Sequence, residues 1–267
     1  MDMMPRILPR GCFSALFLLG VWGAADSLAI AAPITWASPQ TVSGDGDVAT
    51  TGTLLYAYNI GIAGVGSTTI NGVTFSPLAF PTSSQTITSG SVTFTESPGL
   101  LAGYNNLGSN QAPYANLSSA YRSLLDSGGS ANVAATITTT LGGLTAGQEY
   151  LLQWWSSNAA NSSGFEGATL KFTTAAATNS VQLNANTGST PGGLGQYAIG
   201  TFTASGTTQQ FTLDAPLFGT TNPLISGFQV RAVPEPATCV LALAGLVGCG
   251  AALRRRRQAA RAAASRS

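Results

Sequence analysis

Short segments rich in β-branched and aromatic residues recur along residues 33–232, and Gly, Asn, Ser or Pro separates each segment from the next. Alternating apolar side chains in segments of this length are typical of β-strands that bury one face. The expected strands are 34–36, 53–60, 69–75, 91–95, 132–141, 149–156, 168–173, 180–183, 196–204, 209–213 and 225–232. Many short strands with almost no helix predict an all-β domain, and specifically an antiparallel β-sandwich.

One short helix is expected within this β domain, at residues 117–126. Ser118 or Ser119 can cap its first turn, and Gly128-Gly129 is expected to end it. The apolar residues that share one side at helical spacing are Tyr121, Leu124 and Leu125.

Residues 141–150 read LGGLTAGQEY, a turn between two expected strands. This stretch resembles the strand–turn–strand signature of bacterial surface β-sandwiches and is similar to jelly-roll, galactose-binding-like modules. The resemblance implies a core strand directly after the turn, and it implies no ligand.

Aromatic side chains are the candidates for ligand contact. Trp154 and Trp155 are adjacent on the strand after that turn, so their side chains point to opposite faces. One is expected to fill the core, and the other is a candidate platform on which sugar rings stack. The alternative is that protein covers both, since aromatic residues dominate cores. Tyr104 and Tyr114 lie in Asn/Gly/Pro-rich loops, where aromatic residues often contact ligands.

The C-terminal stretch has three parts with separate physical roles. Val233-Pro234-Glu235-Pro236 contains two prolines, which disfavour a helix and keep the peptide extended. The uncharged run 237–253 would form a helix roughly 25 Å long, enough for a thin bilayer. The four consecutive arginines Arg254, Arg255, Arg256 and Arg257 follow it and hold the C-terminus in the cytoplasm. The preceding body is therefore expected outside.

This three-part layout resembles the PEP-CTERM sorting signal of Gram-negative bacteria, a motif also called the ice-binding protein C-terminal domain. The resemblance implies recognition by an exosortase, a membrane transpeptidase that cuts near the Pro-Glu-Pro. It also implies passage through the inner membrane to the cell surface or to an exopolysaccharide matrix. A plain C-terminal membrane anchor is the alternative.

The N-terminus carries the features of a secretory signal peptide. Arg6 and Arg10 precede the apolar stretch 12–25, and small residues at Ala29 and Ala31 allow cleavage after Ala31. The chain therefore divides into a signal peptide at 1–31, an exported β-sandwich domain at 32–232, the sorting signal at 233–257 and a cytoplasmic tail at 258–267.

The composition of the body excludes several functions. Residues 33–232 contain seven acidic and three basic side chains, a net charge of −4. A body so poor in cations has no electrostatic footprint for nucleic acid. The chain has no histidine, which excludes His-based triads and His metal sites. Its three cysteines, Cys12, Cys239 and Cys249, lie in the apolar end segments, so the body has no internal disulfide.

Metal binding and catalysis have weak signals in the body. Asp45 and Asp47 form an Asp-Gly-Asp turn that offers oxygen ligands to Ca²⁺, although Asp is also an ordinary turn residue. No other cofactor is expected. No spacing among the acidic residues indicates a catalytic pair, and the body has no Gly-x-Ser-x-Gly nucleophile motif. We therefore expect no enzymatic activity.

Two function classes remain. The first is a structural or adhesive protein of the cell surface or exopolysaccharide matrix. The second is a non-catalytic carbohydrate-binding module, and a glycan-active enzyme ranks below both. A cluster of exposed aromatic residues beside polar groups would favour glycan binding, whereas a sandwich covered uniformly by Thr and Ser would favour the structural role.

Overall fold

The computed structural model describes residues 33–81, 84–97, 99–131, 136–162, 168–171, 180–214 and 222–234. The expected signal peptide 1–31, the apolar run 237–253, the arginines that follow it and the tail 258–267 lie outside these residues.

The larger layer is an eight-stranded sheet with the order β1-β14-β11-β17-β3-β5-β4, in which β2 also pairs with β14. All its pairs are antiparallel except β3 with β5, which are parallel. The strands are β1 Thr35–Trp36, β2 Gln40–Thr41, β3 Thr53–Gly61, β4 Thr68–Ile70, β5 Val73–Ala79, β11 Glu149–Ser156, β14 Gln196–Thr203 and β17 Gly227–Ala232.

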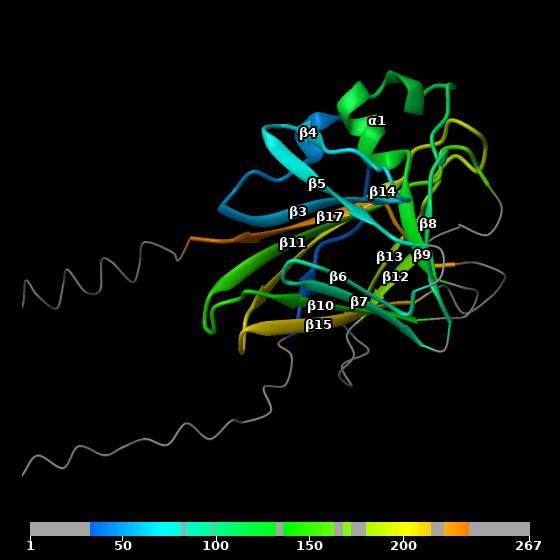
Figure 1. The fold of residues 1–267 in the computed structure, drawn as a ribbon. Helices are drawn as coiled ribbons and strands as arrows, with labels where there is room; N and C mark the ends of the chain where they lie inside the picture. Colours follow the sequence, from blue (N-terminus) through cyan, green and yellow to red (C-terminus); the bar gives the residue numbers. More distant parts are fainter. Residues whose placement is uncertain are drawn as a thin grey trace, which may run out of the picture.

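A six-stranded antiparallel sheet faces it, with the order β13-β12-β15-β10-β7-β6. Its strands are β6 Thr86–Ser89, β7 Val92–Ser97, β10 Thr136–Gly142, β12 Ala168–Lys171, β13 Val181–Leu183 and β15 Thr208–Asp214. Figure 1 shows the two sheets stacked, with the helix α1, Ser119–Leu125, on the far side of the larger sheet. The described residues thus form mostly antiparallel, sandwich-like sheets with one helix, consistent with the all-β domain that the sequence predicts.

A third, three-stranded sheet adjoins the two layers. It has the order β16-β9-β8 and comprises β8 Leu101–Tyr104, β9 Gly128–Ala131 and β16 Leu224–Ile225. Two short 3-10 helices, η1 Asp45–Asp47 and η2 Tyr114–Asn116, lie in the connections.

The main core lies between the two large sheets. Trp154 stacks on Phe228 with ring centroids 5.0 Å apart and meets Phe211 edge-on at 5.3 Å. Tyr150 and Leu152 belong to the same buried cluster, which confirms that they share the face of Trp154. This cluster supplies most of the apolar burial that stabilises the sandwich.

A second core covers the outer face of the larger sheet. Trp155 packs edge-on against Phe75 at 5.5 Å, and its Nε1 donates a hydrogen bond to the Tyr121 hydroxyl at 2.9 Å. Tyr121, Leu124 and Leu125 of α1 are all buried there. The helix therefore forms a partial third layer, and both faces of β11 are covered.

The helix begins as predicted, and its capping residue is now identified. Ser118 accepts a hydrogen bond from Tyr121 N at 3.1 Å, the arrangement of an N-cap. Gly128-Gly129 does not simply terminate the helix, because these residues open the strand β9. A Cβ on Gly129 would lie 2.4 Å from the Phe80 ring, so only glycine allows this close approach.

Threonine hydroxyl groups lie in rows on the outer face of the six-stranded sheet. The pairing register aligns Thr88, Thr93 and Thr140 in one row and Thr86, Thr95, Thr138 and Thr212 in the next. Thr88 and Thr93 share a hydrogen bond of 3.1 Å between their Oγ1 atoms. Threonine suits this surface because it has a high β-propensity without adding charge.

Candidate functional site

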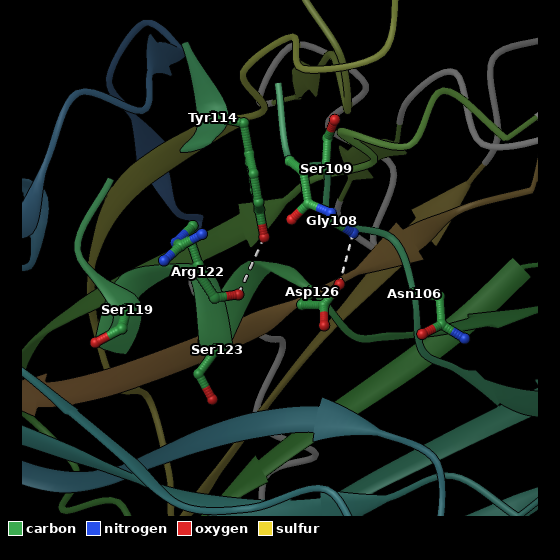
Figure 2. A pocket seen from close by; sticks show the side chains of 9 residues that line it. Asn106, Gly108, Ser109, Tyr114, Ser119, Arg122, Ser123 and Asp126 are labelled. Carbon is green, nitrogen blue, oxygen red and sulfur yellow. Dashed lines mark hydrogen bonds between the residues drawn. The ribbon is translucent and has the colours of Figure 1, made fainter. Parts of the chain in front are cut away.

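A polar cavity of about 500 Å³ lies beside α1. Figure 2 shows that the helix and the loop before it both contribute side chains to it. The lining residues are Asn106, Gly108, Ser109, Asn110, Tyr114, Ser119, Arg122, Ser123 and Asp126.

Asp126 ties the loop to the end of the helix. Its backbone N–H donates to Arg122 O at 2.8 Å and closes the last helical turn. Its Oδ1 accepts a hydrogen bond from Gly108 N at 2.7 Å, and its carbonyl accepts one from Leu107 N at 3.0 Å. These bonds fix one wall of the cavity relative to the other.

Tyr114 closes the cavity from the side of η2. Its hydroxyl donates to Arg122 O at 3.1 Å, and the residue is only 2% exposed. Burial raises the pKa of this phenol well above its usual value near 10, the Asp126 carboxylate raises it further, and the Arg122 cation partly offsets the increase. Tyr114 is therefore a neutral hydrogen-bond donor at any physiological pH.

Arg122 of α1 and Asp126, the C-cap residue of that helix, lie four residues apart, so they share one side of it. The Nε of Arg122 is buried and makes no hydrogen bond to any described group. A guanidinium carries five N–H donors and no acceptor, and it suits recognition of hydroxyl, carbonyl and anionic oxygens. The cavity therefore offers a cation and an anion close together.

A second hollow of about 230 Å³ adjoins the first and shares Ser123 and Asp126 with it. Its other lining residues are Asn59, Ile62, Ala63, Gly64, Val65, Gly66, Asn105 and Ser127. Asn59 Nδ2 donates to Gly66 O at 2.9 Å and so holds the 62–66 loop over the hollow. Asn, Ser and carboxylate groups at this density are suited to hydrogen bonding with a neutral, hydroxyl-rich molecule.

The structure corrects the prediction that one of the two tryptophans offers an exposed ring to a sugar. Trp154 and Trp155 do point to opposite faces, but both are 0% exposed, one in each core. Neither offers a free ring face to a sugar, because α1 covers the side of the sheet that the sandwich leaves open.

The structure places the two predicted ligand-contact tyrosines, Tyr104 and Tyr114, in different surroundings. Tyr104 is the last residue of β8 rather than a loop residue, and it packs against the small cluster of Leu107, Ala185 and Leu224. Tyr114 does line the cavity, but its burial leaves the hydroxyl edge rather than a ring face for any contact. Among the described residues the only large hydrophobic side chain that is exposed is Leu100.

Asp45 and Asp47 serve as hydrogen-bond acceptors. Asp47 Oδ2 accepts from Ser43 N at 2.6 Å, and the Tyr121 hydroxyl donates to the same oxygen at 3.2 Å. Asp45 Oδ1 accepts from the Ser118 hydroxyl at 2.6 Å. The turn is thereby bound to the first turn of α1. The described residues contain no group of three Cys, Asp or Glu side chains placed to hold a metal ion.

The first two residues of the sorting motif are described, and they follow β17 directly. Val233 N donates to Glu149 O at 2.9 Å, and Gln148 Nε2 donates to Val233 O at 2.5 Å. Pro234 is exposed, whereas Glu235 and Pro236 lie outside the described residues.

Sequence reasoning missed the polar residues of the cavity. Its signals were the Asn/Gly/Ser-rich segment 105–110 and the Arg122/Asp126 spacing on one helix face. Neither signal shows that the loop folds back onto the end of the helix.

Comparison with known proteins identifies one motif. Residues 232–257 match the PEP-CTERM protein-sorting motif, which confirms the resemblance seen in the sequence and indicates export through membrane sorting to the cell surface. No curated protein matches the chain. Of the helices in the described part of the chain, none has the length and apolar character needed to cross a bilayer.

Two solved structures show limited similarity. One is the enzymatically active domain of tailspike protein 4 of bacteriophage CBA120, with 11% identity and a TM-score of 0.33 over 54% of this chain. The chain spans only 20% of that tailspike chain. The other is a structure of carbohydrate-binding modules from the β-sandwich superfamily, with 13% identity and a TM-score of 0.15 over 73% of this chain and 97% of the other. TM-scores below 0.5 do not establish a shared fold, so the architecture rests on the sheet topology itself.

Proposed function

We propose that this chain, with its PEP-CTERM motif at residues 232–257, is a non-catalytic structural or adhesive protein of the cell surface or the exopolysaccharide matrix. The signal peptide 1–31 directs export, and the C-terminal run holds the precursor in the inner membrane. An exosortase-type transpeptidase then recognises Pro-Glu-Pro and removes the membrane segment.

The threonine-covered outer sheet is the observation that carries the structural role. Its rows of hydroxyls are spaced by the sheet itself, roughly 4.8 Å from strand to strand. Among the described residues no large aromatic side chain is exposed, so this face interacts through hydrogen bonds rather than stacking. A rigid hydroxyl surface of this kind is suited to contact with neutral, hydroxyl-rich polymers.

Two variants test the sorting step. Glu235→Ala leaves the apolar run and the arginines intact, so the precursor should insert normally but remain uncleaved in the inner membrane. Replacing Arg254, Arg255, Arg256 and Arg257 by Ser removes the charge that fixes topology, so that variant should be lost from the membrane or misoriented. Cell fractionation with an antibody to the body distinguishes these outcomes. Normal processing of Glu235→Ala would favour a plain membrane anchor.

The polar cavity beside α1 favours a second candidate function, binding of a neutral glycan. Its lining combines a cation, a carboxylate and several amide and hydroxyl groups in about 500 Å³, a volume suited to one or two sugar rings. A jelly-roll, galactose-binding-like fold remains a prediction from the sequence of the 141–150 turn. With this second function, the protein would bind a matrix polymer through the cavity without altering the polymer chemically.

A glycan array with mature protein from the native surface tests this candidate. An Asn106→Ala, Arg122→Ala double variant should lose binding at least tenfold, because it removes the donors of both cavity walls. Gln210→Ala, on the exposed outer sheet, is the matched control and should bind normally. Loss of binding in Gln210→Ala alone would place the ligand on the threonine face instead.

A further inference from the structure

We propose that the folded body itself limits access to the sorting motif, through hydrogen bonds that hold Val233 against the sheet. We refer to Gln148, Glu149 and Val233 as the exit clamp. This inference rests on the proposed function because it takes Pro-Glu-Pro to be the processed site.

The exit clamp extends the sheet beyond its last strand. β17 lies between β11 and β3, and its final residue, Ala232, pairs with Tyr150 on one side and Thr53 on the other. Val233 then adds one more backbone bond to Glu149 and accepts the Gln148 side chain. The chain is therefore held on both sides up to Ala232, and on the β11 side up to Val233.

Gln148 is itself held rigidly in place. Its backbone N–H donates to Thr145 O at 3.1 Å within the turn, and its carbonyl accepts from Ala204 N at 2.9 Å. Its side-chain amide also donates to Glu149 O at 3.0 Å. The amide that holds Val233 is therefore part of a fixed turn rather than a freely rotating side chain.

The opposite side of β17 is locked by Arg231 and Gly52. The buried Arg231 guanidinium donates to the carbonyls of Thr50, Thr51 and Gly52 at 2.8–2.9 Å. Gly52 has φ +82°, and a Cβ there would lie 2.2 Å from Ala232 O. The 50–52 loop thus presses directly on the last residue of the strand.

These contacts end at Val233, directly before the Pro-Glu-Pro. Pro234 is exposed and is the first residue of the Pro-Glu-Pro, and the apolar run begins at residue 237. Three residues in an extended chain span at most about 11 Å. Any processing enzyme must therefore work in a gap of this size between the folded sheet and the membrane.

The exposed residues around the exit allow this close approach. They are Thr50, Thr51, Thr53, Thr145, Ala146, Gly147, Thr203, Ser205 and Thr207, and none is charged. Figure 1 shows the end of β17 on the same side of the molecule as the turns after β10 and β14. The side chain of Glu149, in the clamp itself, is partly buried at this end, so the exit presents little exposed charge to an anionic membrane surface.

A protease needs its substrate as extended peptide, so cleavage follows the population in which the clamp is open. Each hydrogen bond of the clamp favours the closed state by about two- to tenfold. The enzyme therefore reads Pro-Glu-Pro and residues after it, and binding any residue before Val233 would require β17 to leave the sheet.

Pulse–chase labelling of the full chain in its native host measures the conversion of precursor to mature protein. Inserting Gly-Ser-Gly-Ser between Val233 and Pro234 frees the motif without touching the body, and processing should accelerate several-fold. Gln148→Ala removes one clamp bond without lengthening the chain, so a smaller acceleration of about two- to tenfold is expected. The same four-residue insertion after the exposed Ser189 is the control and should leave the rate unchanged.

Equal or slower processing of the spacer variant would overturn the proposal. Acceleration by the spacer with no effect of Gln148→Ala would also overturn it, because distance from the membrane would then be the limit. Glu235→Ala, run in parallel, should block processing. If that variant is processed normally, the sorting proposal fails, whereas the spacer and Gln148 variants still report on the clamp.

Discussion

The two ends of β17 are built in different ways. At the Ala232 end, short turns are joined by backbone hydrogen bonds such as Gly147 N to Ala204 O at 2.8 Å, and the chain leaves through the exit clamp. At the Gly227 end, which pairs with Asn59, longer segments around α1 are held by side chains and enclose the polar cavities. Regular backbone pairing gives a rigid exit, whereas side-chain bonding leaves room for a ligand.

High pH should destabilise the region around α1 before it destabilises the region around the exit clamp. Burial raises the pKa of Tyr56, Tyr114 and Tyr121 above the usual value near 10, and two of these lie at the α1 end. A raised pKa in the folded state means that only the unfolded chain ionises just above pH 10. Stability is therefore complete below pH 10 and falls as pH rises, by about 1.4 kcal/mol per pH unit for each tyrosine.

Urea unfolding between pH 8 and 12 measures this loss, and hydrogen exchange shows where it begins. Amides of α1 should lose protection first. A free energy of unfolding that stays constant to pH 12 would contradict the burial of these phenols.

Leu152→Ala should weaken both ends together. Leu152 is fully buried in the main core at the middle of β11, so its truncation leaves a cavity and should cost about 2–5 kcal/mol. The midpoint of thermal unfolding, followed by circular dichroism, measures the effect. An unchanged midpoint would show that this strand does not belong to the core.

Arg231→Met should weaken the exit end alone. The variant keeps much of the side-chain volume but leaves three loop carbonyls without their donor, at a cost of about 2–3 kcal/mol. Hydrogen exchange should increase in the 50–52 loop and at Val233 while the amides of α1 keep their protection. Equal loss at both ends would show that the two regions unfold as one unit.

Ser118→Ala should have a smaller effect at the α1 end. It removes the cap of the helix and the bond to Asp45, and about 1 kcal/mol should be lost. Ser119→Ala, one residue later and exposed, is the matched control and should change stability by less than about 0.5 kcal/mol. Equal effects would mean that Ser118 does not cap the helix.

Strands could be predicted from the sequence where the alternation of apolar residues and the turn residues that bound the segment indicate the same element. The expected strand 149–156 matches β11 in full, and the expected strand 69–75 divides at Asn71-Gly72 into β4 and β5. Both turn residues have positive φ, at 49° and 75°, as Asn-Gly hairpin turns require.

Other parts depend on tertiary contacts that sequence spacing does not show. β9 begins with two glycines, which resemble a helix stop, and their role depends on the approach of Phe80. The burial of both tryptophans depends on α1 covering Trp155, a contact between residues 34 positions apart. The cavity likewise requires the loop before η2 to return to Asp126, which no local pattern indicates.

The threonine rows of the six-stranded sheet have a consequence for the conditions under which the protein works. Counterions screen attraction between charged groups, over about 10 Å at 0.1 M salt, but they have little effect on hydrogen bonds between neutral hydroxyls. A surface of aligned threonines should therefore hold a neutral polymer equally well in fresh and in saline water. Cohesion through this face would therefore change little with ionic strength.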